Sequence, residues 1–134
     1  MKYGTPPLPP YIKRPPEEID KERYQTIYAH SGHSLAAPTA GFHFTQELLH
    51  RLQEKGCTIV GLNLDIGLGT FAPIRTPDLS SLKMHREFYF LPDSTAQAIN
   101  TAKSEGRPLT AVGTTVVRAL ESAALKGLPL KEHQ

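Results

Sequence analysis

Hydrophobic and polar positions in the middle of the chain predict a helix followed by a strand. Thr45 suits the N-cap of a helix that carries three leucines on one face and ends at Gly56. Thr58–Leu64 then holds aliphatic residues with few polar ones, which is typical of a strand buried on both faces. A helix next to such a strand indicates an α/β unit.

The same alternation of strand and helix continues through the second half of the chain. Glu87–Leu91 predicts a strand, and Asp93 or Ser94 is expected to cap a helix that closes at Gly106. Leu109–Val112 predicts another strand, before a last helix from position 114 or 115 to Gly127. Strands that alternate with helices of this length favour βαβ units. We therefore expect an α/β fold with a largely parallel sheet and flanking helices.

The first part of the chain has a different character. Six of the twelve prolines lie within the first sixteen residues, and proline favours a stiff, extended backbone. We interpret this stretch as a linker rather than as a proline-rich ligand for another module. Glu17–Ala29 is charged and compatible with a helix. We expect residues 1–33 to form an extended arm and a linker helix, and residues 34–134 to form part of an α/β domain.

Composition and charge exclude some classes of protein. A formal net charge of +2 neither requires nor excludes nucleic acid, because a small basic patch can lie on a nearly neutral domain. Cys57 is the single cysteine, which excludes an intramolecular disulfide and a cysteine metal cluster. The six histidines form no helical zinc pair with a nearby glutamate, so we expect no metal site. No signal peptide or membrane-spanning run is seen, which favours a cytoplasmic protein.

Two stretches of small residues next to predicted elements are candidates for ligand binding. Ala37–Phe44 precedes a helix, its glycine allows close approach to a ligand, and His43 suits a general acid or base. The alternative is a tight turn with a structural histidine. Asp65–Phe71 is a glycine-rich loop after a strand, where ligands of parallel sheets bind. Asp65 is equally suited to hold a ribose hydroxyl and to cap the loop.

Two further stretches carry titratable or hydroxyl side chains. In Met84–Glu87, His85 and Glu87 point to the same side of an extended chain and suit an acid–base pair, with a solvated edge strand as the alternative. Ala111–Thr115 runs into a glycine and two threonines at a helix start, which suits an anion. An ordinary helix cap is the alternative, with Arg118 paired to a carboxylate along the helix.

In their order along the chain, these stretches resemble the S-adenosylmethionine:tRNA ribosyltransferase-isomerase family of queuosine biosynthesis. Pro7–Ile12 and Arg23–Ala29 also resemble the segment that leads into that family's α/β domain. The resemblance covers nearly the whole chain. Asp65 and Leu82 depart from it, because many members carry histidines at these positions. The resemblance implies a larger two-domain enzyme whose inserted β-barrel domain and C-terminal stretch are absent from this sequence.

The resemblance also implies a reaction and its partners. Members of the family transfer the ribosyl group of S-adenosylmethionine to 7-aminomethyl-7-deazaguanine in the tRNA anticodon and isomerise it to give epoxyqueuosine-tRNA. Adenine and methionine leave, so S-adenosylmethionine is a substrate, and no cofactor is expected. We expect the segment alone to be inactive. The alternatives are a truncated or paralogous nucleoside- or tRNA-binding module without turnover, and a fragment that folds only with a partner chain.

The chemical demands of this reaction, set against the residues of the four stretches, give candidates for each role. His43, His85 and Glu87 are the candidates for proton transfer. The candidate substrate-binding residues are Pro38, Thr39, Gly41, Phe42, Phe44, Asp65, Gly67, Gly69, Thr70, Phe71, Gly113, Thr114, Thr115 and Arg118. Among them, the three phenylalanines are candidates for cation–π attraction to the sulfonium. The turn 113–115 is the candidate site for the methionine carboxylate or a tRNA phosphate.

Overall fold

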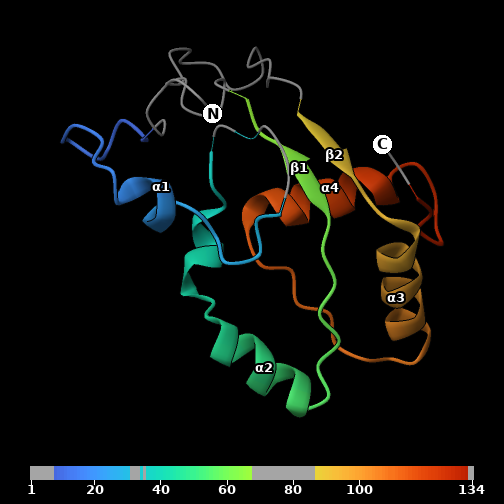
Figure 1. Ribbon diagram of the computed structural model, residues 1–134. Helices are drawn as coiled ribbons and strands as arrows, with labels where there is room; N and C mark the ends of the chain where they lie inside the picture. The colour runs from blue at the N-terminus through green and yellow to red at the C-terminus, as the bar shows by residue number, and fades with distance from the viewer. Residues whose placement is uncertain (1–7, 31–33, 35, 68–86, 133–134) are drawn as a thin grey trace.

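Helices supply most of the regular structure in the computed structural model, which describes residues 8–30, 34, 36–67 and 87–132 (Figure 1). The elements, in chain order, are α1 (Asp20–Arg23), the 3-10 helix η1 (Thr39–His43), α2 (Gln46–Glu54), β1 (Asn63–Asp65), β2 (Phe88–Phe90), α3 (Asp93–Ser104) and α4 (Thr114–Ala124). Together the described residues form a small α/β unit. None of its helices is long and apolar enough to cross a membrane.

The three main helices lie where the sequence predicts them. Thr45 caps α2, because its Oγ1 accepts a hydrogen bond of 3.1 Å from the backbone N–H of Leu48. Gly56 and Gly106 follow α2 and α3 with φ of +82° and +68°, the left-handed conformation that glycine adopts without strain. The N-caps of the other two helices differ from the prediction: Pro92, rather than Asp93 or Ser94, precedes α3, and the glycine at 113, rather than a threonine, precedes α4.

The sheet of the described residues differs from the expectation. β1 and β2 pair antiparallel, with Leu64 opposite Tyr89, so the described strands form no parallel pair. The predicted strand at 58–64 is regular only from Asn63, and Ile59 and Val60 are 43% and 44% exposed rather than buried on both faces. A strand requires a backbone partner on at least one side. Neither 58–62 nor 109–112 has such a partner among the described residues.

A small core joins the strand pair to α3 and α4. Its buried residues are Leu91, Ala96, Ala123 and Leu130, and Leu62, Tyr89, Ile99, Leu120 and Ala124 pack against them. Asn100 on α3 fixes the segment after α4: its amide donates to the carbonyl of Leu130 at 2.7 Å and accepts from the Leu130 N–H at 2.9 Å. In Figure 1 the strand pair lies across α4, with α3 beside it.

The helix expected over Glu17–Ala29 is much shorter than predicted, since α1 comprises only four residues. The Asp20 carboxylate accepts hydrogen bonds from Arg14 at 2.7 and 2.8 Å and from the Glu17 N–H at 2.8 Å. These bonds fold the chain around a buried carboxylate at the start of α1. They also hold the pKa of Asp20 at about 2, chiefly through the Arg14 hydrogen bond.

Candidate functional site

An open cleft of about 690 Å³ lies between the N-terminal arm, the turn before α2 and the start of α4. Its lining includes Tyr11, Tyr24, Ala36–Ala40, Ile66, Ala111, Gly113–Thr115 and Val117. Three of the four stretches singled out in the sequence therefore meet at one place. Five of the candidate binding residues line the cleft: Pro38, Thr39, Gly113, Thr114 and Thr115.

The start of α4 presents unpaired backbone donors beside the cleft. The first hydrogen bond within the helix runs from the Val117 N–H to the Gly113 carbonyl at 3.2 Å, and no side chain caps this end. The N–H groups of Thr114 and Thr115 therefore have no partner within the helix. Gly113 reaches this geometry with a φ of +99°, which a residue with a side chain adopts only with strain. Such a helix start favours an anionic group.

The turn at η1 is held against the arm by close packing. A Cβ on Gly41 would lie 2.7 Å from Cγ2 of Thr26 and 2.9 Å from Cζ of Tyr28, so only glycine fits without displacement. The Phe42 ring meets Tyr24 edge-on with centroids 5.5 Å apart, and Phe44 meets Tyr28 in the same way at 6.3 Å. Gly41 and the two phenylalanines thus anchor the turn, and none of them lines the cleft.

His43 ends η1 and is exposed to solvent, outside the cleft lining. Asp65 and Gly67 are also exposed and flank Ile66, whose side chain does line the cleft. The Ile66 N–H donates to Oγ of Ser34 at 3.3 Å, and that hydroxyl donates to the Ala36 carbonyl at 3.0 Å. This pair of bonds ties the end of β1 to the turn, although the sequence pattern gives Ser34 no such role.

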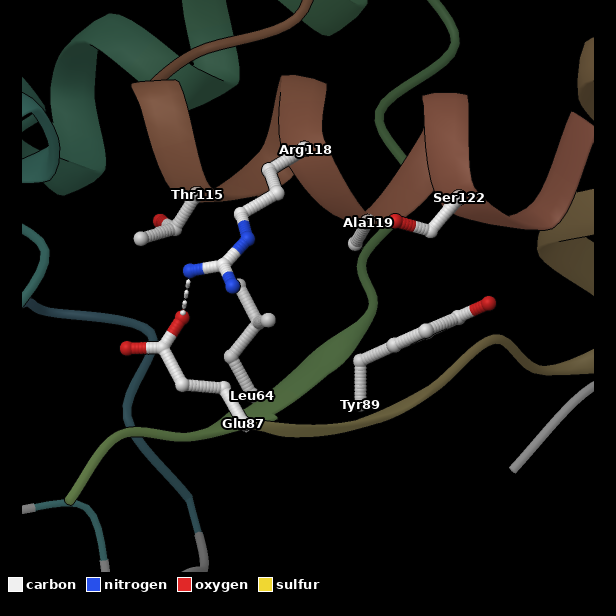
Figure 2. Close-up of a pocket in the computed structure, with 7 residues that line it drawn as sticks. All are labelled: Leu64, Glu87, Tyr89, Thr115, Arg118, Ala119 and Ser122. Atoms are coloured by element: carbon white, nitrogen blue, oxygen red, sulfur yellow. Dashed lines mark hydrogen bonds and ion pairs between the residues drawn. The ribbon is translucent and has the colours of Figure 1, made fainter. Parts of the chain in front are cut away.

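Glu87 and Arg118 form an ion pair of 2.7 Å at a second, smaller cavity of about 80 Å³ (Figure 2). The Glu87 side chain is only 8% exposed, whereas that of Arg118 is 44% exposed. The pair connects the residue before β2 to α4, and Thr115 lines both this cavity and the cleft. The carboxylate expected to transfer protons is therefore paired with a cation on α4, and Arg118 does not line the cleft.

Tyr11 and Tyr24 line the cleft but were absent from the predicted site. Burial raises the pKa of Tyr24 to about 12, and the nearby Tyr11 hydroxyl contributes to the rise. The proline-rich composition predicts a stiff linker. It carries no information about the surface against which the segment folds, so it does not predict that these tyrosines line a cleft. The only sequence signal is the position of each tyrosine within a stretch that resembles the family.

The remaining predicted residues, His85, Gly69, Thr70 and Phe71, lie outside the described residues, as does the departure at Leu82. Within the described part of the chain, no three His, Cys, Asp or Glu residues gather in a way that would hold a metal ion. The described residues that line the cleft carry no charged side chain. Their chemistry consists of small aliphatic groups, hydroxyls, two phenol rings and the open start of a helix.

Comparison with known proteins gives one consistent relationship. The family described as queuosine biosynthesis protein matches residues 1–133. A protein of Treponema denticola named S-adenosylmethionine:tRNA ribosyltransferase-isomerase is 55% identical over 122 residues, which cover 91% of this chain and 35% of the relative. Proteins of the same name from Geotalea uraniireducens and Fusobacterium nucleatum are 50% and 52% identical, over 92% and 91% of this chain and 36% and 34% of their own lengths. The chain spans about a third of the length of these curated relatives.

Proposed function

The chain belongs to the queuosine biosynthesis protein family, and we propose that it supplies the donor-binding part of an S-adenosylmethionine:tRNA ribosyltransferase-isomerase. The observation that carries the proposal is the cleft, where three separate stretches of the sequence meet around one open volume. A volume of about 690 Å³ lies within the range of about 300–1,000 Å³ typical of small-molecule sites. The substrates would be S-adenosylmethionine and a tRNA that carries 7-aminomethyl-7-deazaguanine, which would place the protein in the cytoplasm.

The ends of S-adenosylmethionine match different parts of the cleft. The methionine carboxylate, or a tRNA phosphate, would accept hydrogen bonds from the free N–H groups of Thr114 and Thr115. The hydroxyls of the same residues and of Thr39 would bind the ribose or the amino acid part. The uncharged aliphatic wall, which includes Ile66 and Val117, would exclude water from the nucleoside.

Proton transfer would be served by groups outside the cleft lining. The sulfonium acidifies the 5′ carbon of the donor, a base must remove a proton there, and the attacking amine of the tRNA base must be neutral. His43 lies at the opposite end of the turn whose start, at Pro38 and Thr39, lines the cleft. We assign it to the tRNA side of the reaction. Glu87 would act through its ion pair, by fixing Arg118 and the start of α4.

The full-length protein would complete the sheet. Ile59, Val60 and Leu109 are 43%, 44% and 51% exposed in segments that the sequence predicts as strands. Strands from the remaining two thirds of the relatives' length would pair with these segments and extend the two-stranded sheet into a larger, largely parallel one. The same length would hold the second domain that the resemblance implies.

Binding without turnover is the second candidate function for this chain alone. It is favoured by one observation: the titratable side chains among the described residues of the cleft are two tyrosines, and the Tyr24 phenol stays protonated at neutral pH. A cleft of this kind can hold a nucleoside but offers no base near neutral pH.

Calorimetry with S-adenosylmethionine and detection of free adenine test both candidates. We expect saturable binding to the chain, and adenine release with precursor tRNA only from a full-length relative. Gly113→Ala strains the start of α4 and should weaken binding. Gly106→Ala is its control, because it also replaces a glycine of positive φ but lies at the end of α3, where no atom is within 4 Å of the added Cβ. Absence of binding at millimolar donor would refute the proposal, and adenine release by the chain alone would refute binding without turnover.

A further inference from the structure

Two tyrosines of the N-terminal arm form one side of the cleft. Tyr11 is 67% exposed and follows the fully buried Pro9, while Tyr24 is half-buried just after α1. Their side chains line the same cleft, and the Tyr11 hydroxyl is near enough to contribute to the raised pKa of Tyr24. An aromatic ring that is two thirds exposed, in a cleft lined mostly by small aliphatic groups, offers a flat apolar face to a ligand.

The arm holds these rings in place through contacts of its own. The Ile12 N–H donates to the Pro9 carbonyl at 2.9 Å, which closes the turn that carries Tyr11. The Tyr24 ring is fixed from the side by the edge-on contact with Phe42. Both tyrosines are therefore presented to the cleft before any ligand arrives, and preorganisation lowers the entropic cost of binding.

We propose that Tyr11 and Tyr24 form a base-binding wall: the Tyr11 ring stacks on a planar purine-type base, and the hydroxyl pair hydrogen-bonds to its edge. This inference rests on the proposed function and names a part of the same site. Stacking suits Tyr11 because a base has a π-face and the ring has one open face. The phenol of Tyr24 stays a donor, because its proton is not lost near neutral pH.

The base has two possible sources, the adenine of the donor and the deazaguanine of the tRNA. Both are planar bicyclic rings with polar edges, so the wall fits either of them. The wall would hold the base where the arm lines the cleft, and the open start of α4, which favours an anion, lines the same cleft. A nucleoside with an anionic group at its far end would span the cleft between these two sides.

Adenosine, S-adenosylmethionine and an anticodon stem-loop RNA are the probes for the test. The chain has five tyrosines and no tryptophan, so its emission reports on tyrosine, and stacking on Tyr11 should quench it. Calorimetry gives the dissociation constants of the variants. We expect Tyr11→Ala to weaken binding of the base-bearing probe by about tenfold or more, and Tyr24→Phe by about two- to tenfold. Tyr28→Phe is the matched control, because it removes a phenol hydroxyl outside the cleft lining and should leave binding unchanged.

The results identify the source of the base and separate failure of the wall from failure of the proposed function. If the tyrosine variants lose binding of adenosine, the wall binds the adenine of the donor. If they lose binding of the RNA alone, the wall binds the tRNA base. If the chain binds S-adenosylmethionine with equal strength in wild type, Tyr11→Ala and Tyr24→Phe, the wall is refuted while the proposed function stands. If wild type binds none of the probes, both are refuted. Circular dichroism of each variant shows whether a loss of binding comes from unfolding, and Tyr24→Phe keeps the ring that packs on Phe42.

Discussion

Replacing Gly41 with alanine should destabilise the protein through one added methyl group. That group would lie 2.7 Å from Cγ2 of Thr26 and 2.9 Å from Cζ of Tyr28, both closer than carbon atoms pack. Thr26 is buried and β-branched, so its χ1 angle is restricted and its side chain moves away only at a cost. Overpacking of this kind costs about 1–3 kcal/mol. Alanine also restricts the unfolded chain by about 0.4–1 kcal/mol in the opposite direction. We therefore expect the free energy of unfolding to fall by about 0–2.6 kcal/mol, with the middle of the range at about 1.3 kcal/mol.

Urea denaturation measures this change, and Gly61→Ala is the matched control. Nothing lies within 4 Å of a Cβ at Gly61, and its φ is not in the left-handed region. The control should be neutral or slightly stabilising. Because Gly41 sits in the turn that begins at the cleft, its variant should also weaken binding of S-adenosylmethionine. A Gly41→Ala protein as stable as Gly61→Ala would refute the packing argument and mean that the turn can shift away from Tyr28 at no cost.

Three other outcomes follow from the described contacts. Asn100→Ala should lower the free energy of unfolding by about 1–3 kcal/mol in urea, because the N–H and carbonyl of Leu130 lose their partner, and a change below about 0.5 kcal/mol would contradict this. The pKa of Asp20 is lowered from 3.8 to about 2, chiefly by the Arg14 hydrogen bond. The ionised carboxylate therefore stabilises the folded protein fully above a pH of about 3.8, the pKa in the unfolded chain, and this stabilisation is lost as the pH falls from there to about 2. Asp20→Asn should remove that part of the pH dependence of the melting temperature, and an unchanged acid limb would contradict the assignment. Ile59 is 43% exposed, so we expect the chain to self-associate in sedimentation experiments and Ile59→Lys to restore the monomer. A compact wild-type monomer at high concentration would refute this expectation.

The helices could be predicted because their signals are local. Thr45 lies where its hydroxyl reaches a backbone N–H three residues on, and Gly56 and Gly106 adopt the positive φ that ends a helix. Each of these signals acts within one turn of the chain. α1 shows the limit of such reasoning, because a helix-compatible composition did not reveal that the Asp20 carboxylate would bind Arg14 and the backbone instead.

The strands were predicted less well because a strand depends on its neighbours. The aliphatic run at 58–64 indicates a segment suited to a sheet, but only Asn63–Asp65 finds a partner among the described residues. The direction of that partner, β2, depends on the connection between them and not on the composition of either strand. A pattern of aliphatic residues therefore predicts that a segment can pair, and not with which strand or in which direction it does so.

The site shows the same division between local and distant signals. The sequence predicts the turn at 37–44 and the start of α4 as separate candidates, since small residues and a helix start are local features. Their meeting at one cleft depends on packing between elements, as do the arrival of Tyr11 and the pairing of Glu87 with Arg118 across 31 positions. Residue types suggest Glu87 for proton transfer, and its ion pair with Arg118 is the reason for the positioning role that we propose for it. His43 is exposed and does not line the cleft, so under the proposed function it is the better placed of the two to meet the tRNA.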